Sequence, residues 1–342
     1  MNVRLFDESD RDSWDDYVVS HPAGTFFHLM GWKAVVEQSF GHKACYLVAE
    51  DGEKISGVFP LFSVKSFLFG RSMVSIPFAT YGGILAGSEK VTHSLYDKAV
   101  NLTRQEGLDY LEMRSESAGF GDLPTKDLYY VCKKEILGDN DRNLEALPRK
   151  CRRMVRVGMK SGLKAKFGGV ELLDLFYDLF ASSYHRLGTP VFSKKYLRNL
   201  LDVFGERSSI LIVSKDSRPL SGVLSFYYKD QVLPYYSGAY PESQEHAAND
   251  FLYWALMSDS AEKGYRVFDF GRSKKDTGPY NFKRHWGFEP KPLEYQYYLN
   301  RISELPNISP NNPKYRRCIE LWKKMPLWAT KIIGPRIVKY IP

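Results

Sequence analysis

The chain has few of the residues and motifs that build several common kinds of site. Its 342 residues include four cysteines and seven histidines, and neither set has the spacing of a metal site. The cysteines lie far apart, which is typical of free buried thiols in a reducing cytoplasm. No GxxxxGK[ST], GxGxxG, GxSxG or HExxH motif occurs. The usual signatures of phosphate loops, dinucleotide folds, serine hydrolases and zinc proteases are therefore missing.

Long apolar runs are missing as well. The longest run without a charged residue, 72–88, contains Pro77 and three glycines, and it is too polar to span a bilayer. The first residues, MNVRLFDESDRDSWDD, are acidic and lack the cationic start and the apolar core of a signal peptide. We therefore expect a cytoplasmic protein.

What the chain does have is material for a large core. Hydrophobic residues make up 44% of it and aromatic residues 15%, which argues against disorder, and its length favours two domains. Its 48 Lys and Arg exceed its 40 Asp and Glu, for a net charge of +8. The excess is gathered in a few segments, which indicates an anionic partner.

Four features occur twice, in the same order. Residues 46–62 and 210–227 each show an apolar run, a charged turn, Ser-Gly-Val and a second apolar run, the pattern of a β-hairpin. A strand with small residues and then a helical pattern follow each hairpin, the helices at 91–106 and 247–263. The strands GLDYLEMRS and GYRVFDFGRS close the two copies. The repeat predicts two β-β-β-α-β units in an α/β (α+β) fold, each with a mixed sheet.

Between the two copies, residues 144–167 predict a basic helix. Leu144, Leu147, Cys151, Met154 and Gly158 form an apolar stripe, and Pro148 suits a first helical turn. From residue 142 to 166 there are nine cations and one acid. The cations of the helix are Arg149, Lys150, Arg152, Arg153, Arg156 and Lys160. The helix either presents a solvated face or faces an anion, because it lacks carboxylates for intrahelical pairing.

A second cluster of cations lies in FDFGRSKKDTGPYNFKRHWGFEP, residues 268–290. The Asp-Phe-Gly triplet is not a kinase motif, since no Gly-rich loop, strand Lys or HRD-type loop precedes it. The cations follow a predicted strand, where open α/β sheets bind ligands, and Thr277-Gly278-Pro279 predicts a turn. The cations are Arg272, Lys274, Lys275, Lys283 and Arg284; the interleaved aromatic residues are Tyr280, Phe282 and Trp286. These rings could line an acyl channel, stack on a base or simply pack, and the whole segment could be a surface loop.

The last 30 residues, 313–342, are basic and apolar, with eight cations and one acid. Trp322, Leu327, Trp328, Ile332 and Ile333 supply apolar anchors, and we expect Pro326 and Pro335 to break the segment into short pieces. One reading is an amphipathic segment in peripheral contact with an anionic membrane, on the inner face of the plasma membrane. The other is a helix that packs back onto the body.

Together these stretches resemble the Fem family, the peptidoglycan-bridge aminoacyltransferases typified by FemA, FemB and FemX. The resemblance covers about 26–298 and rests on FFHLMGWKAVV, SGVFPLF, PFATYGG, the basic helix and YNFKRHWGF. It implies two tandem GNAT-like acyltransferase domains, which fits the repeat. It also implies that Phe282 and Lys283 correspond to the family's Phe-Lys segment, whose Lys lies beside bound phosphate or developing negative charge.

A subgroup associated with exosortase/PEP-CTERM and exopolysaccharide gene clusters is the most similar, through RLGTPVFSKKYLRNLL and LPRKCRRMVR. Two features depart from the wider pattern. The long coiled-coil arm of some Fem members has no counterpart, so tRNA contacts that need the arm are in doubt. The acetyl-CoA loop [QR]xxGx[GA] of GNAT enzymes does not occur either, which disfavours an ordinary acetyl-CoA enzyme.

The resulting hypothesis is an acyl- or aminoacyltransferase that forms an amide or ester on a phosphorylated cell-envelope precursor, a nucleotide- or lipid-linked part of peptidoglycan or exopolysaccharide. The donor would be an aminoacyl-tRNA or an acyl-CoA, a co-substrate rather than a bound cofactor. Lys283 would hold phosphate or stabilise the oxyanion, and Asp250 and His246 are candidate general bases. The predicted substrate-binding residues are Arg272, Tyr280, Phe282, Arg284, Trp286, Arg152, Arg153, Arg156, Tyr81, Gly82 and Gly83.

Two alternatives stay open. One is a non-catalytic protein that holds an anionic polysaccharide precursor at the membrane, and the other is a CoA-dependent N-acetyltransferase. The expected boundaries are a first domain over 1–140, a basic connecting helix over 141–165, a second domain over 166–300 and the basic tail over 301–342.

Overall fold

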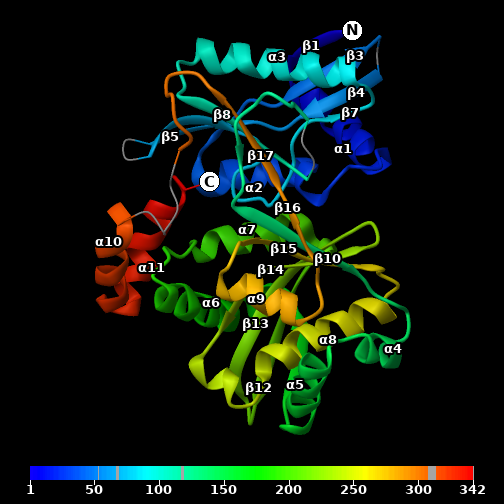
Figure 1. Ribbon diagram of the computed structural model, residues 1–342, viewed down its shortest axis with the longest axis vertical. Coiled ribbons are helices and arrows are strands. Elements are labelled where there is room, and N and C mark those ends of the chain that lie inside the picture. Colours follow the sequence, from blue (N-terminus) through cyan, green and yellow to red (C-terminus); the bar gives the residue numbers. More distant parts are fainter. Residues whose placement is uncertain (53, 67–68, 117–118, 307–312, 342) are drawn as a thin grey trace. The chain divides into compact units, whose positions relative to one another are not determined.

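The computed structural model describes residues 1–52, 54–66, 69–116, 119–306 and 313–341. The chain forms two compact units, drawn in Figure 1. Unit 1 comprises residues 1–128, 292–312 and 339–342, and unit 2 comprises residues 129–291 and 313–338. The predicted domains are contiguous, whereas unit 1 takes up a late segment of the chain and unit 2 begins before residue 140.

The described residues of unit 1 form two sheets. Their orders are β1-β3-β4-β7 and β2-β5-β6-β8-β17-β9. The strands are β1 Asn2–Leu5, β2 Lys43–Ala44, β3 Leu47–Asp51, β4 Lys54–Phe59, β5 Phe62–Ser66, β6 Gly70–Val74, β7 Leu85–Ala86, β8 Tyr110–Ser115, β9 Thr125–Lys126 and β17 Glu294–Leu299. The helices are α1 Arg11–Ser20, α2 Met30–Phe40 and α3 Glu89–Gln105. The first predicted hairpin and the helix at 91–106 are confirmed as β3–β4 and α3.

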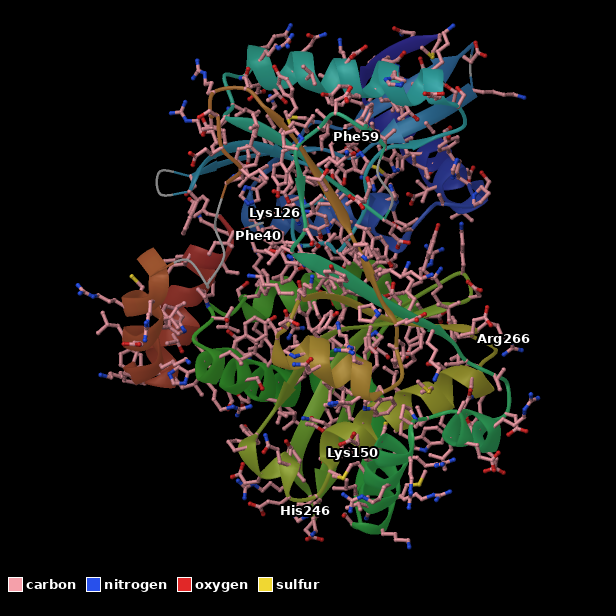
Figure 2. The ribbon with its side chains drawn as sticks, viewed as in Figure 1. Phe40, Phe59, Lys126, Lys150, His246 and Arg266 are labelled. Atoms are coloured by element: carbon pink, nitrogen blue, oxygen red, sulfur yellow. The ribbon has the colours of Figure 1, made fainter. Side chains whose placement is uncertain are left out.

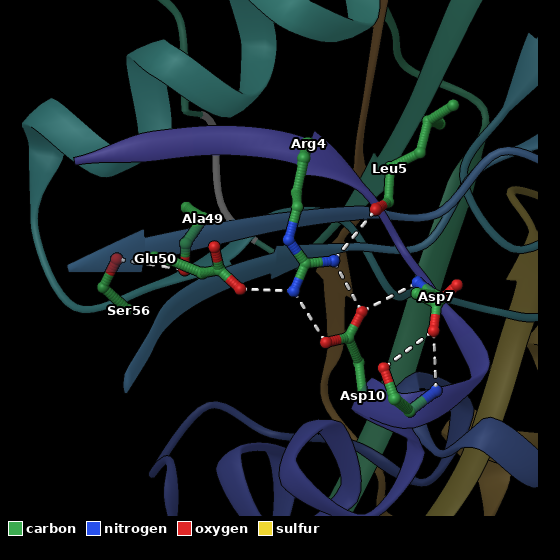
Figure 3. A network of polar contacts seen from close by, with 8 residues as sticks. Arg4, Leu5, Asp7, Asp10, Ala49, Glu50 and Ser56 are labelled. Atoms are coloured by element: carbon green, nitrogen blue, oxygen red, sulfur yellow. Dashed lines mark hydrogen bonds and ion pairs between the residues drawn. The ribbon is translucent and has the colours of Figure 1, made fainter. Parts of the chain in front are cut away.

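A polar network ties the start of the chain to the first sheet (Figure 3). The guanidinium of Arg4 on β1 donates to both oxygens of Asp10, at 2.7 Å each, and also to Glu50 on β3. Asp10 in turn accepts from the backbone N–H of Asp7 at 2.7 Å. Charge-assisted, bidentate bonds of this kind fix geometry, so the network holds β1 in register beside β3.

Unit 2 is built on one seven-stranded sheet in the order β11-β12-β13-β14-β15-β10-β16. The strands are β10 Tyr129–Glu135, β11 Lys164–Gly168, β12 Ser208–Lys215, β13 Arg218–Tyr228, β14 Gln231–Ala239, β15 Val267–Lys274 and β16 Pro290–Pro292. The helices are α4 Asn140–Glu145, α5 Arg149–Lys160, α6 Leu173–Leu187, α7 Lys194–Phe204, α8 Ala248–Glu262, α9 Gly278–His285, α10 Pro313–Lys324 and α11 Leu327–Val338. The second hairpin and the helix at 247–263 are confirmed as β12–β13 and α8.

Helices α6 and α8 cover opposite faces of this sheet. Leu211 and Val213 on β12 belong to the same core as Leu252 on α8. Ile212, which points the other way in the strand, lies beside Gly222 of β13 on the face that α6 covers. The alternation of apolar residues along β12 therefore builds two cores, one on each side of the sheet.

The sheet approaches α6 most closely at Gly238 on β14. A Cβ placed there would lie 2.4 Å from the backbone N and Cα of Phe180. We expect Gly238→Ala to lower the free energy of unfolding by about 3 kcal/mol, because two backbones would have to separate. Gly278→Ala is the matched control, since no atom lies within 4 Å of its added Cβ, and it should change stability by about 0.5 kcal/mol or less. Equal denaturation midpoints for the two variants would contradict this account.

The expected basic helix over 141–165 is not one helix: α4 ends at Glu145, α5 covers Arg149–Lys160 and β11 begins at Lys164. The predicted stripe is present in part, because Cys151 and Gly158 are buried but Val155 rather than Met154 completes the buried face. Cys151, Val155 and Gly158 are the buried residues of α5, and Gly158 meets Phe251 and the carbonyl of Ala247 at the start of α8. Pro148 is the residue before the first turn of α5, where its missing N–H costs nothing.

Two local expectations are wrong. Thr277-Gly278-Pro279 does not form an isolated turn: Thr277 precedes helix α9, and Pro279 lies in its first turn, where proline is tolerated. Pro335 does not break the tail but lies inside α11. Gly334 and Val338 on either side of Pro335 are buried, and their packing offsets the hydrogen bond that the proline lacks.

Candidate functional site

Strands β14 and β15 separate in the middle of the unit 2 sheet. They are parallel and pair only at Gln231↔Val267 and Val232↔Phe268, although the strands continue to Ala239 and Lys274. Beyond residue 268 the backbone N–H and C=O groups of β15 no longer pair with β14. The candidate site lies at this end of β15.

The Asp-Phe-Gly triplet forms a bulge in β15. In the pairing with β10, Val131 lies opposite Arg272 and Lys133 opposite Asp269, so Phe270 and Gly271 share one partner position. Gly271 has φ +63°, which favours glycine. Asp269 is fully buried, accepts from the N–H of Gly271 at 2.7 Å, and lies 3.5 Å from Lys133 Nζ. The triplet is a structural bulge whose conformation its own carboxylate supports.

Lys283 on α9 reaches the carbonyl groups of this bulge. Its Nζ donates to Gly271 O at 3.1 Å and to Arg272 O at 3.0 Å. The residue is 8% exposed, and Nζ lies 5.9 Å from the centre of the Phe270 ring. An ammonium group has three N–H donors, and among the described residues the third has no acceptor.

Burial controls the ionisation of this lysine. Removal from water lowers the pKa of Lys283 to about 8, and the neighbouring Cys132 and Asp269 oppose that shift. The side chain is therefore still mostly cationic at pH 7 but close to its titration range. A buried cation with one donor to spare is suited to binding an oxygen that carries or gains negative charge.

Aromatic side chains surround this end of β15. Tyr253 on α8 packs edge-on to Phe270 at 4.9 Å between ring centres, and Phe282 and Trp286 lie 5.5 and 6.1 Å from Tyr253. Ser237 on β14 hydrogen-bonds to Tyr253, while burial raises the pKa of that phenol. Phe282 and Trp286 of the predicted segment thus form one packed cluster with Tyr253 of α8 and Phe270, beside Lys283.

Asp250, in the first turn of α8, contacts this cluster. Its Oδ1 accepts from Trp286 Nε1 at 3.3 Å. Burial raises the pKa of the Asp250 carboxyl, and the bond from Trp286 opposes the rise. A carboxylate that is partly removed from water is a stronger base than an exposed one, so the group suits proton transfer.

His246, labelled in Figure 2, lies in the loop before α8. Its Nδ1 is 3.4 Å from Nζ of Lys215, at the end of β12. Among the described residues no hydrogen bond or ion pair joins it to Lys283 or Asp250. Its contacts connect it to the end of the second hairpin.

The remaining predicted residues of the segment lie on both sides of Lys283. The guanidinium of Arg272 stacks 4.7 Å from the ring centre of Tyr129 on β10. Tyr280 is buried and packs on Tyr130 at 5.7 Å, and the exposed Arg284 lies 5.9 Å from the Tyr280 ring centre. The guanidinium groups of Arg272 and Arg284 therefore lie beside aromatic faces, which attract cations.

The arginines of α5 form a separate basic surface. Arg153 and Arg156 are exposed and Arg152 is half-buried. Arg152 donates to the carbonyl of Glu145 at 3.1 Å, but no carboxylate among the described residues pairs with any of the three. Figure 2 labels Lys150 in the first turn of the same helix. This surface has charge available for an anionic ligand.

The predicted residues of unit 1 lie in a buried, strained loop. Tyr81 packs edge-on to Phe27 at 5.4 Å, and a Cβ on Gly83 would lie 2.4 Å from Ser115 Oγ. Ile76 and Phe78 in the same loop have φ values of +46° and +64°, which non-glycine residues rarely adopt. Strain of this kind is often found where a backbone must keep a functional shape.

Buried Arg114 supports that loop, and sequence reasoning missed it. The residue is 2% exposed, donates from Nε to Glu112 at 2.7 Å and from Nη1 to Ala79 O at 3.3 Å, and lies over the ring of Tyr295. Tyr253, Asp269 and Ser273 were missed as site residues too. Ser273 Oγ is buried with no hydrogen-bond partner among the described residues. The terminal Arg-Ser shared by β8 and β15 was the available signal for Arg114 and Ser273.

Comparison with known proteins identifies the fold. Residues 147–284 match the sequence profile of an acetyltransferase (GNAT) domain, and no curated protein sequence matches the chain. The solved structure of FemX is similar over 93% of this chain and 100% of its own, with a TM-score of 0.68 and 15% identity. The structure of L-PGS from Bacillus licheniformis is similar over 89% of this chain and 96% of its own, with a TM-score of 0.54 and 13% identity.

A tandem GNAT protein from the clavulanic acid biosynthesis pathway is also similar, over 89% of this chain and 100% of its own, with a TM-score of 0.53 and 13% identity. The predicted fold of two tandem GNAT-like units is confirmed by these matches. The profile match begins at Leu147 and ends at Arg284, so it includes the basic helix, β14, α8, β15 and Lys283.

Proposed function

We propose that this chain is an acyltransferase that moves an acyl or aminoacyl group from an aminoacyl-tRNA or acyl-CoA to an amine or hydroxyl of a phosphorylated cell-envelope precursor. The observation that carries the proposal is Lys283, a buried cation with one N–H donor unused among the described residues, at the point where β14 and β15 separate. The GNAT-domain match over 147–284 and the tandem GNAT-like fold support it.

The reaction needs stabilisation of one developing charge. The amine or hydroxyl attacks the carbonyl carbon of the donor ester or thioester, and the carbonyl oxygen becomes an oxyanion. The bond from carbon to the leaving oxygen or sulfur then breaks, and the leaving group gains the proton that the nucleophile loses. The free N–H of Lys283 would donate to the oxyanion, and burial strengthens that bond because water does not compete.

The nucleophile's proton needs an acceptor. Asp250 is suited to this role because burial raises its pKa, and Trp286 fixes one of its oxygens. The backbone N–H of Asp250 also interacts with this carboxylate and, like the bond from Trp286, opposes the rise of its pKa. His246 stays a second candidate, with Lys215 as its neighbour.

The basic surface of α5 would bind the phosphates of a substrate. Arg152, Arg153 and Arg156 have no carboxylate partner in the described part of the chain, and arginine forks match phosphate oxygens. A pyrophosphate-linked precursor or the backbone of a tRNA would supply those oxygens.

The decisive experiment offers the protein both kinds of donor. The full chain is incubated with labelled aminoacyl-tRNA or acyl-CoA and a panel of nucleotide- and lipid-linked envelope precursors. Appearance of the label on a precursor, in an amide or ester, would support the proposal. Tight precursor binding without label transfer from either donor would instead support a non-catalytic binding protein.

The rate of transfer should depend on the charge of Lys283. Since its pKa is lowered to about 8, we expect the maximal rate to be flat well below pH 8, to be half-maximal near pH 8 and to fall about tenfold per pH unit well above it. A pH profile of the maximal rate checks this. A rate that rises through pH 8 would mean that the neutral amine acts, and would contradict the oxyanion role.

The same shift has a consequence for stability. Lys283 titrates near pH 8 in the folded chain and near its ordinary 10.5 in the unfolded chain. Between these values the unfolded state binds more protons, so this group makes stability rise with pH. Loss of activity above pH 8 would therefore not arise from unfolding driven by Lys283.

A further inference from the structure

The net charge of the chain is concentrated in two segments. Residues 142–166 have nine cations and one acid, and residues 313–342 have eight cations and one acid. The rest of the chain has 31 cations and 38 acids. Outside these two segments the protein is therefore acidic, and a basic tail of 30 residues stands out.

The tail also exposes large apolar side chains. The exposed fractions are 64% for Leu321, 67% for Trp328, 55% for Ile332 and 38% for Ile333. Leaving this much apolar surface in water is unfavourable, and tryptophan is enriched where proteins meet the boundary between lipid and water.

Cations and apolar residues share the outward faces of both tail helices. On α10, Arg317, Leu321 and Lys324 follow one another at steps of four and three, and all three are exposed. On α11, Trp328, Ile332 and Arg336 follow at steps of four, and these are exposed as well. Residues at such steps lie along one helical face.

The inward faces of the same helices are fixed to unit 2. Both helices pack on α6. His185 Nε2 is 2.8 Å from Met325 O between the helices, and Lys331 on α11 pairs with Asp178 at 2.7 Å. Thr330 and Gly334 are buried, and a Cβ on Gly334 would lie 2.8 Å from Val191 N. The tail therefore packs on the body while its outward faces stay exposed.

We propose that the outward faces of α10 and α11 bind the surface of an anionic lipid bilayer, with the helices lying in the plane of the interface. The cations would contact lipid phosphates while Leu321, Trp328 and Ile332 enter the acyl boundary. None of the helices in the described ranges is long and apolar enough to cross a bilayer, so the contact would be peripheral. A second copy of this chain would bring two basic faces together, and a nucleic acid would leave the apolar residues in water.

The test measures co-sedimentation of the full chain with vesicles, independently of any transfer activity. Vesicles of phosphatidylcholine with about one third phosphatidylglycerol should sediment the protein, and pure phosphatidylcholine vesicles should not. We expect Leu321→Ser/Trp328→Ser/Ile332→Ser and Arg317→Glu/Lys324→Glu/Arg336→Glu each to weaken partitioning at least tenfold. Circular dichroism verifies that both variants are folded.

Two controls separate the tail from other surfaces. Leu175→Ser removes an exposed apolar residue (45% exposed) from α6 and should leave partitioning unchanged. Arg149→Glu/Arg153→Glu/Arg156→Glu reverses the charge of three residues on α5. It should lower partitioning onto anionic vesicles less than the tail variants do. Unchanged binding by the tail variants, or equal binding to neutral vesicles, would overturn the proposal. The proposal would also be overturned if the wild-type chain did not bind vesicles but formed a dimer, and if the tail variants abolished that dimer.

Discussion

Replacing Lys283 with Met is expected to lower the rate of acyl transfer about 100-fold while the chain stays folded. The loss of one preorganised donor to an oxyanion typically costs this much. Methionine is unbranched and apolar, so it can fill the space of the lysine stem in the packed surroundings of Phe270. Initial rates with the donor and acceptor identified by the labelling experiment would measure the effect.

Stability changes in this variant should be modest, because two effects oppose each other. Removing the ammonium leaves Gly271 O and Arg272 O without its bonds, but it also removes a cation whose burial is unfavourable. Lys275→Met is the matched control. Lys275 is exposed and directly follows the last residue of β15, and its loss should leave the rate unchanged. A Lys283→Met enzyme with wild-type turnover would remove Lys283 from the mechanism.

Replacing Arg114 with Met should destabilise the protein by about 3–5 kcal/mol. Arg114 is 2% exposed, and its partner Glu112 is 7% exposed. Without the guanidinium, the Glu112 carboxylate would stay buried without its main opposite charge. Leaving one charge of a buried ion pair uncompensated is strongly destabilising. The carbonyl of Ala79 would lose a donor too. Chemical denaturation followed by circular dichroism measures the loss.

A double variant identifies the cause. In Arg114→Met/Glu112→Gln the carboxylate charge is gone, so much of the stability should return relative to Arg114→Met alone. If the double variant is as unstable as the single one, the cost comes from lost packing on Tyr295 and the loop rather than from the unpaired charge. In either case the loop that contains Tyr81 should become more accessible to protease.

Local patterns in the sequence were enough to predict most elements of the repeat. The two Ser-Gly-Val hairpins, α3 and α8 follow from periodicity and turn residues, because neighbouring residues determine these features. The predicted stripe placed Cys151 and Gly158 correctly on the buried face of α5, but it chose Met154 where Val155 is the buried residue. For the candidate site, a family resemblance pointed to Lys283, and the clustered charge pointed to the basic helix; both stay predictions.

Long-range pairing could not be read from those patterns. β10, early in the chain, lies beside β15, and β17, near its end, lies between β8 and β9. No periodicity within a strand specifies such a partner, so the discontinuity of unit 1 was missed. The segment after β15 looked like a loop because its Gly and Pro are turn formers, yet packing of Tyr280 and Lys283 makes it helix α9.

By itself, the sequence therefore determined the local elements, the repeat, the concentration of charge and the absence of the common nucleotide and metal motifs. Only the tertiary structure decided which charges are buried. The spare donor and lowered pKa of Lys283 depend on β10, α9 and the β15 bulge, and the exposure of Trp328 depends on which face of α11 packs on α6. Desolvation is a property of surroundings that distant parts of the chain supply, so no local pattern can encode it.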